Sequence, residues 1–124
     1  MIHISSGIDL IEIERVTEAV NRHGNRFLER VFTGGELSEC QGNLASLAGR
    51  FAAKEAVAKA LGTGIGPVAW KEIEILRGPA REPILFLHGA AAELAAQKKL
   101  IHWSISLSHT ATLAVAVVFA LGEG

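Results

Sequence analysis

The stretch LAGRFAAKEAVAKALGTG, residues 47–64, predicts a helix that runs into a glycine-containing loop. At 100° per residue its apolar side chains gather on one side, and Glu55 falls inside that stripe, four residues after Phe51. An isolated charge on a buried face is costly unless it is neutralised, paired or bound to a cation. The position of Glu55 therefore points to a function, and a solvated glutamate paired with Lys59 at i+4 is the plain alternative.

Strands and further helices are predicted on both sides of this long helix, which we place at Leu44–Leu61. Trp103, Ile105 and Leu107 alternate with serines, which is typical of a half-buried strand that should pair antiparallel with the last one. The class is therefore α+β, with one domain over residues 1–124. The other predicted strands are Ile2–Ile8, Glu72–Leu76, Pro83–Leu87 and Thr112–Ala120, and the other helices are Ile11–Asn21, Arg26–Phe32, one capped by Thr33 and Gly89–Lys99.

The composition excludes several classes of protein. The 124 residues are 49% hydrophobic and 20% charged, which is typical of a folded globular chain. A net charge of −1 gives no general attraction to nucleic acid. The most apolar segment, residues 112–121, is too short to span a bilayer as a helix, and the N-terminus does not resemble a signal peptide. With Cys40 as the only cysteine, we expect a cytoplasmic protein without a membrane partner.

Asp9 is the natural second carboxylate, because it follows the first predicted strand. Taken alone it would be interpreted as the N-cap of the helix that follows. Together with Glu55 it suggests a hard divalent cation, since Mg²⁺ typically takes one or two carboxylates, waters and phosphate oxygens.

The loop GTGIGP, residues 62–67, is neither a dinucleotide fingerprint nor a Walker A sequence, because it follows a helix and lacks the Gly-Lys-Ser/Thr ending. A glycine stop of the helix is the favoured interpretation, although its backbone N–H groups could hold a phosphate. His109 stands alone at a bend after a strand. The basic residues Arg15, Arg22, Arg26 and Arg30 either form a solvated face or meet an acidic protein.

Taken together, these stretches resemble the holo-acyl-carrier-protein synthases, bacterial 4′-phosphopantetheinyl transferases of fatty-acid synthesis. The resemblance lies in GIDLIEIERV (7–16), RFLERVFTGGEL (26–37), LAGRFAAKEAVAKALGTGIG (47–66) and SISLSHTATLAVAVV (104–118), in the family's order. It implies an enzyme that moves the 4′-phosphopantetheine arm of coenzyme A to a serine of apo-acyl carrier protein and releases adenosine 3′,5′-bisphosphate.

The resemblance also implies roles for individual residues. Asp9 and Glu55 match the magnesium carboxylates, and Lys59 would stabilise charge on the leaving group. Whether Glu55 or a water takes the serine proton stays open. The resemblance places His109 with Glu55 and Lys59 among the catalytic residues. The residues that match coenzyme contacts are Arg50, Lys59, Gly62, Thr63, Gly64 and His109, and those that match the carrier-protein face are Arg15, Arg22 and Arg26.

The family works as a homotrimer with active sites between subunits, and we expect the same here. The last strand is apolar at successive positions, so both of its faces should be covered, and one layer of helices can cover only one of them. Two other functions remain open. One is a transferase serving polyketide or peptide carrier proteins, which the short chain disfavours. The other is a non-catalytic coenzyme-binding module, which leaves Asp9 and Glu55 without a shared purpose.

Overall fold

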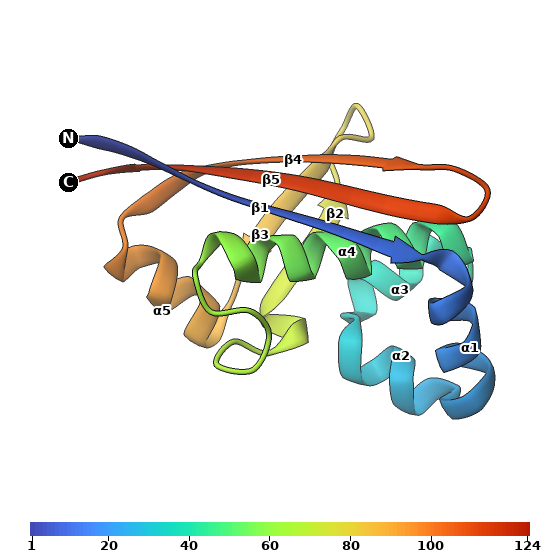
Figure 1. Ribbon diagram of the computed structural model, residues 1–124. Coiled ribbons are helices and arrows are strands. Elements are labelled where there is room, and N and C mark those ends of the chain that lie inside the picture. The colour runs from blue at the N-terminus through green and yellow to red at the C-terminus, as the bar shows by residue number, and fades with distance from the viewer.

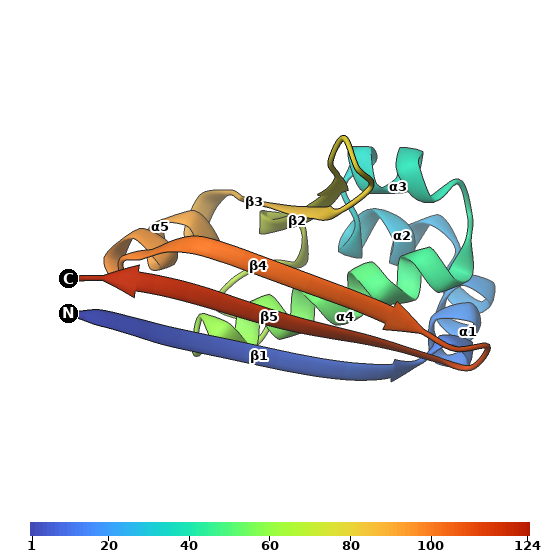
Figure 2. The ribbon, with the colours of Figure 1, turned by 90° about the horizontal axis from the view of Figure 1, so that it is seen from above.

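Three long strands form one antiparallel sheet, and the helices all lie on one side of it (Figure 1). The computed structural model describes all of residues 1–124. The strands are β1 (Ile2–Glu12), β4 (Leu100–His109) and β5 (Leu113–Glu123), with β5 in the middle (Figure 2). The predicted antiparallel pairing of the last two strands is confirmed, and so is the α+β class.

The first strand is longer than predicted. The expected end at Ile8 is wrong, because β5 offers β1 a backbone partner at each position from Ile2, opposite Glu123, to Glu12, opposite Leu113. Asp9 therefore lies within the strand, opposite Ala116, and is neither at its end nor an N-cap. The helix α1 (Ile13–His23) begins later than predicted, after Glu12.

The long helix α4 (Leu44–Ala60) crosses beneath the three-stranded sheet. Asn43 caps its N-terminus by accepting a hydrogen bond from the Ser46 amide. The predicted single apolar stripe is too narrow, because 11 of the 17 residues are buried, including Arg50 and Lys54. Glu55 is only half-buried, at the edge of this surface. The helix is covered by the sheet on one side and by other elements on most of the rest.

Gly7 allows β1 to lie directly on α4. A Cβ atom at this position would stand 1.9 Å from the main-chain oxygen of Ala56. No side chain fits there, so the glycine sets the close approach that brings β1 and α4 together.

The remaining elements cover the end and the side of α4. Helices α2 (Asn25–Val31) and α3 (Gly34–Cys40) follow α1, and Thr33 caps α3 in a capping box with Glu36, as predicted for Thr33. The 3-10 turn η1 (Trp70–Glu72) leads into a separate hairpin of β2 (Ile73–Arg77) and β3 (Pro83–Leu87), followed by α5 (Gly89–Gln97). None of the helices combines the length and the apolar character that crossing a membrane requires.

The outer face of the three-stranded sheet is apolar along β1 and β5 and bare of the chain's own elements. Along β5, Ala114, Ala116, Val118 and Ala120 are buried toward α4, and the residues between them face the other way. Ile4, Ile8 and Leu10 of β1 are 71%, 60% and 61% exposed, and Phe119 beside them is 51% exposed. A single chain thus covers one face of its last strand and leaves the other open.

Candidate active site

Asp9 and Glu55 line one cavity of about 350 Å³. Asp9 comes from the face of β1 that looks toward α4, and Glu55 comes from α4 itself. Arg15 stands at the same cavity, and Phe27 and Phe51 are among its apolar lining residues. The two carboxylates that the sequence pairs are therefore brought together, with a cation and two aromatic rings beside them.

The charge of Glu55 is poorly compensated. Burial raises the pKa of the Glu55 carboxyl above its usual range, and the negative charge of Asp9 raises it further, while Lys59 opposes both. Lys59 does not form an ion pair with Glu55. Its ammonium donates to the main-chain oxygen of Ile8 at 2.8 Å and lies 3.3 Å from the Asp9 carboxylate. The i+4 pair considered from the sequence is therefore wrong.

This carboxylate pair fits a magnesium ion. The structure has no cluster of three or more His, Cys, Asp or Glu side chains that could enclose a metal. Two carboxylates at an open cavity, with the charge of Asp9 raising the pKa of Glu55, suit a cation that completes its shell with water and substrate oxygens. Asp9 and Glu55 would supply its protein ligands.

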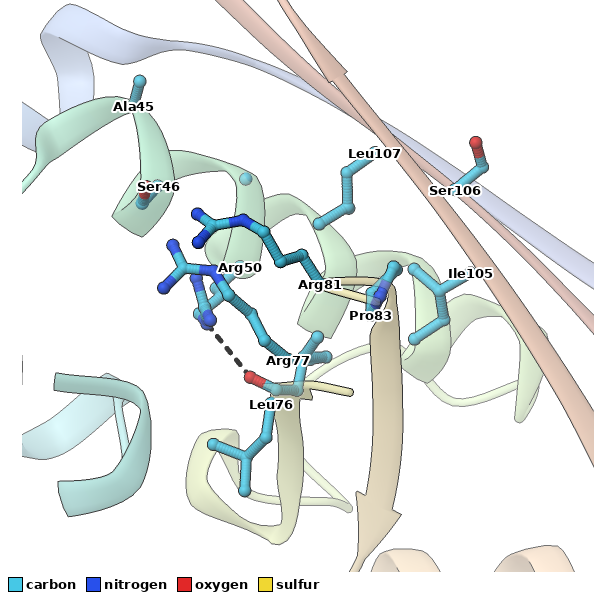
Figure 3. Close-up of a pocket in the computed structure, with 12 residues that line it drawn as sticks. Ala45, Ser46, Arg50, Leu76, Arg77, Arg81, Pro83, Ile105, Ser106 and Leu107 are labelled. Carbon is cyan, nitrogen blue, oxygen red and sulfur yellow. Dashed lines mark hydrogen bonds between the residues drawn. The ribbon is translucent and has the colours of Figure 1, made fainter. Parts of the chain in front are cut away.

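A second cavity, of about 330 Å³, lies beside α4, β2 and β4 and is lined by three arginines. Figure 3 shows the side chains of Arg50, Arg77 and Arg81 reaching the same space, with Ser46 beside them. No acidic side chain lines it. Such a cavity suits a ligand with several negative charges.

The Arg50 side chain is held in place by Ile75 and Glu39. Its Nε donates to the main-chain oxygen of Ile75 at 3.0 Å, and one terminal nitrogen lies 2.6 Å from the Glu39 carboxylate. Arg77 donates to the Glu39 main-chain oxygen at 3.0 Å. Arg81, in the turn between β2 and β3, has no ion pair and adopts a left-handed φ of 66°. Arg50 is thus the rigid member of the three, and Arg81 is the exposed one.

The two cavities lie on different sides of α4 and share no lining residue. At 100° per residue, Arg50 and Glu55 point about 140° apart around the helix. Within one chain, the arginines and the carboxylates therefore do not form one continuous site.

The loop of Gly62, Thr63 and Gly64 serves as the stop of α4. The Gly62 amide donates to the main-chain oxygen of Lys59 at 2.9 Å, and the other two amides donate to that of Ala58 at 3.1 Å. The loop lines neither cavity. Its predicted coenzyme contact therefore cannot use these amides as they stand in this structure, and stays a prediction.

His109 ends β4 and is exposed. It lies in register with Ala114 of β5, which in turn pairs with Ile11 of β1, two residues beyond Asp9. The side chain lines neither cavity. Its predicted role is therefore not explained within a single chain.

The predicted carrier-protein arginines lie at the α1–α2 end of the molecule. Arg15 borders the carboxylate cavity, and Arg22 is exposed on the same helix. Arg26 lines a small hollow of about 240 Å³ with Phe27, His23 and Arg30. This end of the molecule presents cations around an aromatic side chain.

Sequence reasoning missed four charged residues. Arg77 and Arg81 stand on either side of the Gly78-Pro79 turn, and only their position in a hairpin beside α4 shows that they reach Arg50. Glu36 and Lys54 are both fully buried. Lys54 directly precedes Glu55 in the sequence. Helical periodicity would place Lys54 on a covered face only if the helix were expected to be buried on more than one side.

Comparison with known proteins identifies the family of this chain. The profile of the 4′-phosphopantetheinyl transferase superfamily matches residues 5–118. A holo-[acyl-carrier-protein] synthase from Herpetosiphon aurantiacus is 47% identical over 124 residues, covering 94% of this chain and 98% of its own. Its counterpart from Alkaliphilus metalliredigens is 49% identical over 117 residues, covering 92% and 95%.

A solved structure has the same fold. The holo-[acyl-carrier-protein] synthase of Helicobacter pylori, in complex with coenzyme A, superimposes with a TM-score of 0.86 at 36% identity, over 93% of this chain and 98% of that one. Profile, sequence relatives and fold thus agree over nearly the whole chain, which belongs to the 4′-phosphopantetheinyl transferase superfamily.

Proposed function

We propose that this transferase moves the 4′-phosphopantetheine arm of coenzyme A onto a serine of apo-acyl carrier protein, in fatty-acid biosynthesis. The serine oxygen attacks the phosphorus that bears the arm, the bond from that phosphorus to the bridging oxygen breaks, and adenosine 3′,5′-bisphosphate leaves. The observation that carries the proposal is the pair of cavities of opposite charge on either side of α4. One suits the phosphates of a coenzyme, and the other suits a cation.

The arginine cavity is the proposed site for phosphate groups of coenzyme A. Arg50 is held in place by Ile75 and Glu39, so its guanidinium is preorganised for an anion. Arg77 and Arg81 add positive charge to the same space. The Helicobacter pylori relative was solved in complex with coenzyme A, which supports a coenzyme site in this fold.

The carboxylate cavity is the proposed reaction centre. Asp9 and Glu55 would hold Mg²⁺, which when bound neutralises pyrophosphate charge. The Lys59 ammonium lies 3.3 Å from Asp9, which lines the cavity, and would stabilise negative charge on the leaving group. The serine proton passes to Glu55 or to water, and a shift in the pH profile of kcat for Glu55→Asp would identify Glu55.

The face around Arg15, Arg22 and Arg26 is the proposed docking site for an acidic carrier protein. Phe27 and Phe51 offer an apolar hollow next to these cations, so a partner could combine charge pairing with one buried apolar side chain. This face borders the reaction centre, which is where the acceptor serine must arrive.

Assembly into a homotrimer is part of the proposal. The bare sheet face and the separation of the two cavities both support it, because a neighbouring subunit could cover Ile8 and Phe119 and bring its arginines to this chain's carboxylates. His109, exposed at the end of β4, would then contribute across the interface. We place the enzyme in the cytoplasm, consistent with a single, buried cysteine.

The test is to mix the protein with coenzyme A, Mg²⁺ and apo-acyl carrier protein and to look for the phosphopantetheine mass increment on the carrier. We expect the increment with Mg²⁺ and its loss with EDTA. Coenzyme binding without transfer would favour the non-catalytic module. Faster modification of a polyketide or peptide carrier protein in direct competition would favour the other transferase class.

A further inference from the structure

A fully buried ion pair lies behind both cavities and lines neither of them. The Lys54 ammonium of α4 stands 2.8 Å from the Glu36 carboxylate of α3, and both side chains are 0% exposed. Every other ion pair in the structure has a partner that is at least 20% exposed or involves a histidine. This pair is therefore set apart by its burial.

Every polar atom of the pair has a hydrogen-bond partner. Lys54 donates to the main-chain oxygens of Trp70, at 3.0 Å, and Ile73. Glu36 accepts from the amide of Thr33 and from that of Ile75, both at 2.9 Å. No buried side-chain nitrogen or oxygen lacks a partner. The two side chains thus tie α4 and α3 to the backbone of η1 and β2.

The tied backbone supports the arginine cavity. The Ile75 amide donates to the Glu36 carboxylate, and the Ile75 main-chain oxygen accepts a hydrogen bond from Arg50 Nε at 3.0 Å. Two residues later the same strand carries Arg77 to the cavity. The Glu36–Lys54 pair therefore sets where β2 lies against α4, and with it the spacing of Arg50 and Arg77.

The same pair supports the carboxylate cavity from the other side. Lys54 holds the main chain of Trp70, whose ring lies 4.6 Å from that of Phe51, centroid to centroid. Phe51 lines the cavity of Asp9 and Glu55. The Lys54 ammonium is thus connected to both cavities. Glu36 links it to Ile75, which lines the arginine cavity, and Trp70 links it to Phe51, which lines the carboxylate cavity.

Stability alone does not account for such a pair. Taking two charges out of water offsets much of their attraction, and well-packed apolar residues are often as stable or more stable at such positions. We infer that Lys54 and Glu36 are positioning residues for the transfer reaction, which hold β2 and Trp70 so that both cavities keep their shape. This inference rests on the assignment of the cavities in the proposed function.

The test replaces both charges together, with Glu36→Gln and Lys54→Met in one chain. Glutamine keeps an acceptor for the Ile75 amide, and methionine fills most of the lysine volume. We expect the folded variant, assayed well below its unfolding temperature, to show a KM for coenzyme A raised about tenfold or more and a lower kcat. Isothermal titration should show coenzyme binding weakened by a similar factor.

The matched control is Leu100→Ala, which removes core volume at the far end of β4, away from both cavities. It should lower the unfolding temperature and leave KM and kcat at their wild-type values. Wild-type kinetics in the folded double variant, or an equal kinetic loss in Leu100→Ala, would overturn the inference.

If the double variant does not fold, Glu36→Gln alone must show the same rise in KM, and its absence would overturn the inference as well. If the wild-type protein transfers nothing, the proposed function fails by itself. The inference then stands or falls on coenzyme binding in the titration.

Discussion

Lys59 lies 3.3 Å from the carboxylate of Asp9, on a strand 50 residues earlier in the chain, and leaves Glu55, one helical turn before it, without an ion pair. The lysine offsets the charge of Asp9 and fastens β1 to α4 through the Ile8 main-chain oxygen. Glu55 is left as a half-buried carboxylate whose raised pKa reflects both burial and its neighbour Asp9. The site therefore holds one negative charge, on Glu55, that no ion pair compensates.

Asp9→Asn and Glu55→Gln should each lower kcat by about a hundredfold or more, because each removes a ligand charge at the proposed reaction centre. Circular dichroism should show both variants folded, since neither change leaves a buried ion without its partner. Full turnover by either variant at ordinary Mg²⁺ would remove that residue from the metal site.

The stability of the metal-free protein should fall as pH rises through the pKa of Glu55. The folded-state pKa lies above the unfolded one, so the folded state binds the proton more tightly, and this advantage disappears once the carboxyl ionises. In EDTA, Glu55→Gln should be more stable than wild type at neutral pH and similar to it in acid, measured by urea unfolding. Adding Mg²⁺ should stabilise wild type and not the variant. If the stability of wild type and that of Glu55→Gln changed with pH in the same way in EDTA, the raised pKa of Glu55 would be contradicted.

Arg15→Glu should raise the KM for carrier protein about tenfold and change the KM for coenzyme A less, because Arg15 lies on the proposed docking face and outside the arginine cavity. Added salt should weaken carrier binding by wild type and have less effect on the variant. Equal changes in both KM values would argue against a dedicated docking face.

Gly7→Ala should destabilise the protein by about 1–3 kcal/mol or more, because its Cβ would stand 1.9 Å from the Ala56 main-chain oxygen. Gly34→Ala is a suitable control, since a Cβ there meets nothing within 4 Å. Chemical denaturation of both variants gives the comparison. An unchanged midpoint for Gly7→Ala would mean that β1 can move away from α4 freely.

Mixing inactive Glu55→Gln subunits with inactive His109→Ala subunits should restore part of the activity, if a carboxylate site from one subunit is completed by a neighbour. Light scattering would establish that mixed trimers have formed. A fully active monomer at working concentration would contradict the proposed assembly. Failure of confirmed mixed trimers to recover activity would mean that both residues serve one site from the same chain.

The sequence was sufficient for features that depend on local spacing. The long helix was predicted at Leu44–Leu61 and runs Leu44–Ala60, and Thr33 caps α3 as its position before Gly34 suggests. The end of β1 was missed, because it depends on β5, more than a hundred residues later, continuing to supply hydrogen-bond partners beyond Ile8.

Within the candidate site, helical periodicity identified Glu55 as a residue on the apolar face. It could not show that Lys59 forms its ion pair with Asp9 and not with Glu55. Arg77 and Arg81 were missed for the same kind of reason. They meet Arg50 only because the hairpin lies across the side of α4, an arrangement that no local spacing specifies. Lys54 was missed because its buried partner, Glu36, lies 18 positions earlier in the chain and on another helix.

The alanines of α4 limit how this protein can diverge. Six alanines of this helix are at most 3% exposed: Ala48, Ala52, Ala53, Ala56, Ala58 and Ala60. Neighbouring elements therefore pack closely against their methyl groups on several sides of the helix. Any larger residue would need compensating changes in more than one neighbouring element at the same time. Over evolutionary time, substitutions should therefore accumulate on the exposed side of α5, while α4 changes slowest, even at positions that touch no substrate.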